Sequence, residues 1–89
     1  MRAVITVLGT DKVGIIAAIS STLASANVNI LDITQTIMQG IFTMIMVVDV
    51  ACANTGFDEL AGMLKVTGEK MDLQIRIQRE DIFNSMHRI

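Results

Sequence analysis

The chain has 89 residues, of which 52% are hydrophobic and 18% are charged, and its formal net charge is −2. This length is typical of one domain, expected to span residues 1–89, and so short a chain has little interior. We therefore expect part of the apolar surface to be covered by a partner, in a homodimer or a higher assembly.

The composition also argues against several classes of protein. Seven Lys and Arg are scattered through a chain without Trp or Tyr, which disfavours a nucleic-acid partner. One cysteine, Cys52, excludes an intrachain disulfide and a multi-cysteine metal site, and we expect it to be buried near a strand end. No apolar stretch reaches the ~20 residues of a membrane helix. We expect a cytoplasmic protein with no membrane partner and no cofactor.

The first elements are predicted from apolar spacing. Residues 2–9 are apolar on both faces, which is typical of a strand near the centre of a sheet. A helix is expected over 14–26, ending at Asn27, because asparagine tolerates the left-handed conformation. Its inner stripe recurs at helical spacing and consists of Ile15, Ile16, Ile19, Leu23 and Ala26.

Two strands joined by a tight turn should follow. In residues 28–38, Leu31, Ile33 and Ile37 alternate with polar residues, which predicts a half-buried edge strand. Gln35 interrupts this series, which indicates a bulge or an edge. Gln39 and Gly40 suit a tight turn, and the apolar run over 41–52 predicts a third strand near the sheet centre.

The second half of the chain repeats this order. Thr55 and Asp58 resemble a capping box at the start of a helix that begins at Gly56 or Phe57. Poor helix formers predict that this helix ends within 66–70. Residues 72–80 alternate strictly between apolar and polar side chains, so they predict a fourth strand.

A short helix is expected over 81–89. Its apolar residues fall on one face and are Ile82, Phe83, Met86 and Ile89. So short a helix is not stable in water by itself. We expect it to dock on the sheet face away from the two longer helices, in the same subunit or in a partner.

The order βαββαβ predicts an α+β fold of the ferredoxin-like class. Right-handed crossovers give a four-stranded antiparallel sheet of order 4-1-3-2 with both longer helices on one face. The core is expected over 2–80, followed by the short helix.

The corner between the first strand and the first helix is the main candidate site. Backbone N–H groups around Val13, Gly14 and Ile15 lack intrahelical partners at a helix start, and such groups attract anions. Asp11 offers an alternative, since its carboxylate can cap the helix by accepting the N–H of Val13 or Gly14. Lys12 is expected to be solvated.

Other functions found on this fold lack their residues here. The first loop has neither the paired cysteines of a metal chaperone nor the arginine of an acylphosphatase-like enzyme. Phe42 is the only aromatic residue on the strands that stack RNA bases in RNA-binding sheets. The one histidine, His87, is expected on the solvated face of the last helix, without a nucleophile beside it. We therefore expect no enzymatic activity and no metal site.

Two segments resemble the ACT domain family over residues 3–79. They are T-D-K-V-G-I-I-A at 10–17 and L-A-S-A-N-V-N-I at 23–30, and residues 81–89 further resemble small stand-alone ACT proteins. The resemblance implies a side-by-side dimer through an edge strand and a helix. It also implies an amino acid bound at that interface and control of a separate enzyme or transcription factor.

The amino acid can be placed on the residues of this chain. The N–H groups of Val13, Gly14 and Ile15 would hold its carboxylate. Asp11, or carbonyls near Asn29 and Ile30 across the interface, would take its ammonium. Asn29 has an equally good alternative role, which is to bond its own backbone where the strand begins. The alternative function is an interaction module that pairs with a protein target and binds no small molecule.

Overall fold

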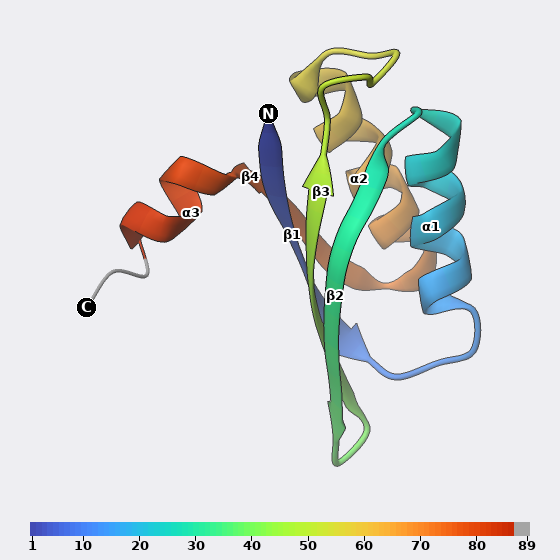
Figure 1. The fold of residues 1–89 in the computed structure, drawn as a ribbon. Coiled ribbons are helices and arrows are strands. Elements are labelled where there is room, and N and C mark those ends of the chain that lie inside the picture. Colours follow the sequence, from blue (N-terminus) through green and yellow to red (C-terminus); the bar gives the residue numbers. More distant parts are fainter. Residues whose placement is uncertain (87–89) are drawn as a thin grey trace.

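The structure, a computed structural model, describes residues 1–86. Its elements follow the predicted order and are shown in Figure 1: β1 (Arg2–Thr10), α1 (Ile15–Ser25), β2 (Asn29–Met38), β3 (Ile41–Asp49), α2 (Phe57–Met71), β4 (Leu73–Arg79) and α3 (Glu80–Met86). The expectations for His87 and Ile89 lie outside the described residues.

The four strands form one antiparallel sheet of order β2-β3-β1-β4, which confirms the predicted topology. On the central strand β1, Ile5 lies between Met46 of β3 and Ile77 of β4. Both α1 and α2 cover the same face of the sheet, whereas α3 lies on the opposite side (Figure 1). β2 and β4 are the two edges.

The core lies between the sheet and the two long helices. Alternate residues of β1 and β3 point into it, because successive side chains of a strand face opposite sides. The largest fully buried side chains are Ile5, Val7, Ile19, Leu23, Met44, Met46, Val48, Leu60 and Leu64. Ile16, predicted on the inner stripe of α1, is instead 39% exposed, because it faces the uncovered edge of the sheet.

β2 differs from the prediction of a half-buried strand. Leu31, Ile33 and Ile37 are 47%, 40% and 54% exposed. The irregularity in the pairing lies between Ile30 and Asp32 rather than at Gln35. β2 is the edge strand, and the two long helices of a single chain do not cover it. An exposed apolar edge of this kind has unpaired backbone groups that can pair with a further strand.

Neither long helix has the side-chain cap that was predicted. The N-cap position of α1 is Gly14, whose φ of 91° is left-handed, and that of α2 is Gly56; at both helix starts no side chain caps the backbone N–H groups. Asp11 therefore does not cap α1. The capping box of Thr55 and Asp58 does not form, and the Thr55 hydroxyl is buried without a partner among the described residues.

The end of α2 also differs from the prediction. The helix continues to Met71 and ends at Asp72, which adopts the left-handed conformation. Gly68 is buried there, and a Cβ at Gly68 would lie 2.7 Å from the carbonyl oxygen of Leu73. Close packing of α2 on β4 thus prevails over the low helix propensity of the segment.

The turns that depend on backbone conformation are confirmed. Asn27 has a φ of 58° after α1, and Gln39 and Gly40 have φ values of 52° and 80° between β2 and β3. Cys52 is exposed rather than buried. β3 ends at Asp49, whose carboxylate accepts the N–H of Ala51 at 2.9 Å, so Cys52 lies in the turn beyond the sheet.

α3 follows β4 without a loop and contacts β1 and β4 on the side away from the long helices (Figure 1). Arg2 and Glu80 form an ion pair of 3.0 Å at this junction. Ile82 of α3 is still 46% exposed. Across residues 1–86, none of the helices combines the length and apolar character that crossing a bilayer requires.

Candidate functional site

The corner between β1 and α1 is fixed by two hydrogen bonds from its own residues. The backbone N–H of Asp11 donates to the carbonyl of Gly40 at 2.8 Å, which joins the corner to the β2–β3 hairpin. The ammonium of Lys12 donates to the carbonyl of Met71 at the end of α2. Lys12 is therefore half-buried and bonded, not solvated as predicted.

The start of α1 carries backbone donors that no side chain of the helix satisfies. The first intrahelical bond runs from the N–H of Ala18 to the carbonyl of Gly14 at 2.9 Å. The N–H groups of residues 15–17 precede it and have no helical acceptor. No acidic residue lies in the first turn and no side chain caps it. The helix start is thus electrostatically suited to an anion.

A hollow of about 310 Å³ lies against this helix start and reaches the edge strand β2. It is lined by Asp11, Lys12, Gly14, Ile15, Ile16, Ala17, Gln35, Ile37 and Phe42. Of the predicted site residues, Asp11, Gly14 and Ile15 are therefore brought together. Val13 is 99% exposed beside the hollow and does not line it.

Gln35 and Ile37 contribute the β2 side of the hollow, and the sequence reasoning did not assign them to it. Gln35 pairs with Met44, which is fully buried, so Gln35 points to the helix-covered side of the sheet. An amide in an otherwise apolar inward row was visible in the sequence as the interruption between Ile33 and Ile37. That interruption marks a lining residue, not a bulge.

Asn29 and Ile30 lie at the other end of β2. Asn29 pairs with Asp49, whereas the hollow lies near Gly40. Since a strand rises about 3.3 Å per residue, Asn29 lies roughly 20 Å from Gln35 and roughly 26 Å from Ile37, the two residues of β2 that line the hollow. Asn29 lines a different hollow of about 340 Å³, together with Ala24, Asn27, Val28 and Cys52. Within one chain, Asn29 and Ile30 therefore do not lie beside the predicted site residues of the β1–α1 corner.

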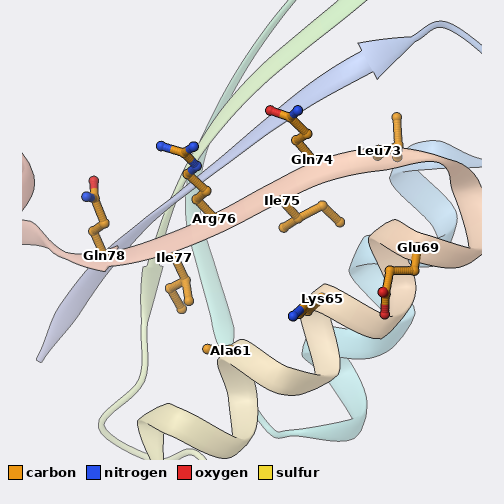
Figure 2. Close-up of a pocket in the computed structure, with 9 residues that line it drawn as sticks. All are labelled: Ala61, Lys65, Glu69, Leu73, Gln74, Ile75, Arg76, Ile77 and Gln78. Atoms are coloured by element: carbon orange, nitrogen blue, oxygen red, sulfur yellow. The ribbon is translucent and has the colours of Figure 1, made fainter.

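A larger hollow, of about 570 Å³, follows the opposite edge of the sheet between α2 and β4. Figure 2 shows Ile75 and Ile77 pointing toward α2, with Lys65 and Glu69 along the helix. None of the predicted site residues lies there. Size alone does not identify a ligand site, and the uncapped helix start lies at the smaller hollow, so we assign the candidate site to the β1–α1 corner.

Comparison with known proteins gives one consistent result. A family model described as ACT domain matches residues 2–78. A UPF0237 protein of Clostridium acetobutylicum is 55% identical over 89 residues, which is 100% of both chains. An ACT domain protein from Streptococcus pneumoniae superposes with a TM-score of 0.81 and 38% identity, covering 93% of each chain.

The same fold also occurs inside a longer enzyme chain. A formyltetrahydrofolate deformylase from Pseudomonas syringae matches with a TM-score of 0.80 and 25% identity. The match covers 88% of this chain but 27% of the deformylase.

Proposed function

The chain belongs to the ACT domain family, and we propose that it is a non-catalytic regulatory module that binds an amino acid at the interface of a homodimer. The observation that carries this proposal is the uncapped start of α1, which borders a hollow open toward the exposed edge strand β2. The helix start suits a carboxylate, and the strand edge suits a second copy.

The choice of β2 as the dimer edge follows from a comparison of the two sheet edges. Charged side chains on an edge strand discourage pairing with another strand. β4 carries Arg76 and Arg79 over seven residues, whereas β2 carries only Asp32 over ten. β2 also exposes Leu31, Ile33 and Ile37, which pairing would bury.

If the two-fold axis of the dimer is perpendicular to the sheet and passes beside β2, the β2 strands of the two subunits run antiparallel to each other. The start of β2 in one subunit then lies beside the end of β2 in the other. Asn29 and Ile30 of one subunit would thereby approach the corner hollow of its partner. This arrangement would bring together predicted site residues that lie toward opposite ends of β2 within one chain.

The ligand contacts follow from the chemistry of the lining. The N–H groups at the start of α1 would hold the carboxylate, and Asp11 or carbonyls near Asn29 and Ile30 of the partner subunit would take the ammonium. Most of the remaining lining is apolar, including Ile15, Ile37 and Phe42. Millimolar to micromolar binding needs about 4–8 kcal/mol, whereas the helix start supplies about 0.3–2 kcal/mol, so side-chain burial must provide the rest.

The test is a thermal-shift screen of the twenty amino acids against the purified protein. A ligand at ten times its Kd stabilises the folded state by about 1.4 kcal/mol, which raises the Tm of so small a domain by several degrees. Ile37→Glu should abolish the shift, because it places a charge in the apolar hollow. Val66→Glu, on an exposed position of α2, is the matched control. No shift with any amino acid at millimolar concentration would contradict the proposal.

The second candidate is a protein-interaction module without a small ligand. It is favoured by the exposed apolar residues of β2 and by the short apolar helix α3. Capture of a protein target that is unaffected by Asp11→Ala and Gly14→Val would support this candidate over the first.

A further inference from the structure

The edge strand β4 has a free side, because no further strand of residues 1–86 lies beyond it in the order β2-β3-β1-β4. All seven of its residues pair with β1, from Leu73 with Gly9 to Arg79 with Ala3, without a shift of register. Along so regular a strand, alternate residues direct their N–H and C=O groups to opposite sides. The free side of β4 therefore presents backbone groups that an added strand can bond.

A hollow of about 570 Å³ follows this free edge, and we call it the β4 groove. One wall is residues 73–78 of β4, and the other is a single stripe of α2, formed by Ala61, Lys65 and Glu69. Ile75 and Ile77 line the groove as partly buried side chains that also pack on the core, so its floor is apolar. Figure 2 shows Ile77 pointing toward α2 beside the short side chain of Ala61. α3 lies on the opposite side of the sheet (Figure 1).

A free strand edge beside a helix is suited to an extended peptide. The edge supplies main-chain hydrogen bonds, and every second side chain of the added strand enters the space between the edge and the helix. In the β4 groove those side chains would meet Ile75 and Ile77, which favours apolar residues at alternate positions. The remaining side chains of the added strand would lie on the face of the sheet away from α2.

Arg76 gives that other face a preference for charge. Its side chain points away from α2 (Figure 2), and among the described residues it takes part in no ion pair. A residue opposite Arg76 on an added strand has its side chain on the same face, where an acidic group is favourable and a basic group is not. Lys65 and Glu69 on the helix wall carry opposite charges, so that wall favours neither sign.

A second copy of this chain does not supply such a strand. β4 carries Arg76 and Arg79 and no acidic residue, so two β4 strands would bring like charges together. β2 of another copy would join two unlike edges, and such a contact extends into an open row of subunits instead of a closed assembly. The arginines that disfavour a second copy thus favour an acidic segment of a different protein.

We propose that the β4 groove binds an extended segment of a partner protein, which becomes the fifth strand of the sheet. The side chains of this segment that face α2 are apolar, and the side chain opposite Arg76 is acidic. The contact goes beyond the proposed amino-acid site, because it uses neither the β1–α1 corner nor the β2 edge. A dimer joined through β2 has one β4 groove at each outer border.

The test uses short fluorescent peptides in which valine alternates with glutamate, glutamine or lysine. Fluorescence anisotropy should show saturable binding of the glutamate peptide, one per chain, and about five-fold weaker binding of the lysine peptide. Arg76→Glu should reverse this order. Lys70→Glu, the same charge change at an exposed position of α2 outside the groove, is the matched control and should leave the order unchanged.

Main-chain pairing is tested separately by N-methylation, which removes an N–H donor without changing charge. The glutamate peptide is methylated either on its valine residues or on its glutamate residues. Only alternate N–H groups of an added strand face β4, so one version should bind at least about ten-fold more weakly than the other. Equal affinity of the two versions would show that no strand is added to the sheet.

The remaining controls separate this proposal from the others. Thermal unfolding reports that each variant is folded, and any amino-acid-induced thermal shift should be the same in Arg76→Glu as in the wild type. Absence of saturable binding, or an order of affinity that Arg76→Glu leaves unchanged, overturns the proposal. A peptide that lowers the sedimentation mass assigns the groove to a second copy and overturns it as well. If the amino-acid screen fails while the peptide results hold, the amino-acid site is wrong and the β4 groove stands.

Discussion

The backbone N–H of Asp11 donates a 2.8 Å hydrogen bond to the carbonyl of Gly40, so the β1–α1 corner is attached to the hairpin between β2 and β3. The ammonium of Lys12, the next residue, bonds the carbonyl of Met71 at the end of α2. Two neighbouring residues thus connect the candidate site to both halves of the fold. The geometry of the helix start depends on contacts far away in the sequence.

The Lys12 bond gives a first prediction. Lys12→Met removes a charged donor from the last turn of α2, where a cation is also favoured by the helix dipole. We expect the free energy of unfolding to fall by about 1–2 kcal/mol, the usual contribution of a hydrogen bond to a charged group. Urea denaturation measures this loss. Lys65→Met, at an exposed position of α2, should be nearly neutral; equal losses in both variants would contradict a specific role for Lys12.

Gly14 gives a prediction that separates backbone strain from ligand binding. Its φ of 91° is unfavourable for any residue with a Cβ, although a Cβ there would meet no atom within 4 Å. Gly14→Ala should therefore cost about 1–2 kcal/mol through conformation alone and displace the N–H groups of the helix start. Gly40→Ala is the matched control, because Gly40 has a φ of 80° and equally open space. Both should lower stability in denaturation, but only Gly14→Ala should strongly reduce the ligand-induced thermal shift.

The two glycines inside α2 should respond to alanine in opposite directions. A Cβ at Gly68 would lie 2.7 Å from the carbonyl oxygen of Leu73. Gly68→Ala should destabilise by about 1–3 kcal/mol, because α2 must move away from β4. Gly62 is exposed and a Cβ there meets nothing within 4 Å, so Gly62→Ala should stabilise by up to about 1 kcal/mol. Parallel Tm measurements test the pair, and a stabilising Gly68→Ala would contradict the close packing.

Acidification should remove a small part of the stability through Asp49 and Asp81. The hydrogen bond from the N–H of Ala51 holds the pKa of Asp49 below its usual value of 3.8. The hydrogen bond from Arg79, and then its charge, likewise lower the pKa of Asp81. A lowered folded-state pKa stabilises the protein above the unfolded value, and this contribution is lost as the pH falls through the folded pKa.

The measurement is the Tm as the pH falls from neutral to below about 3.8, the ordinary pKa of both carboxyl groups. Asp49→Asn and Asp81→Asn should each make the acid-side loss of Tm smaller, and high salt should reduce the difference because both groups are exposed. Asp58→Asn is the control at an exposed position without an ion pair among the described residues. Acid curves that coincide for wild type and both variants would show that these contacts contribute nothing.

Much of the fold could be predicted from the sequence by itself. Apolar spacing, the left-handed Asn27 and the Gln39–Gly40 turn fixed the elements, and connection rules then gave the sheet order. The helices, strands and turns depend on local sequence, and the sheet order follows from the handedness of crossover connections. Both can therefore be inferred without knowledge of the tertiary contacts. The start of α1 as an anion-accepting corner is equally local, because any helix start leaves donors without partners.

Only the tertiary structure decided what surrounds those elements. It leaves Ile33 and Ile37 uncovered, because burial depends on which strand becomes an edge and on how far two helices reach. It gives Lys12 a partner on α2, places Gln35 in the hollow, and separates Asn29 from the corner. Periodicity reports which face of a strand a residue occupies, but not whether another element covers that face. That is the physical reason why the sequence gives the architecture of this protein, whereas its hollow and its exposed surfaces emerge only when the chain is folded.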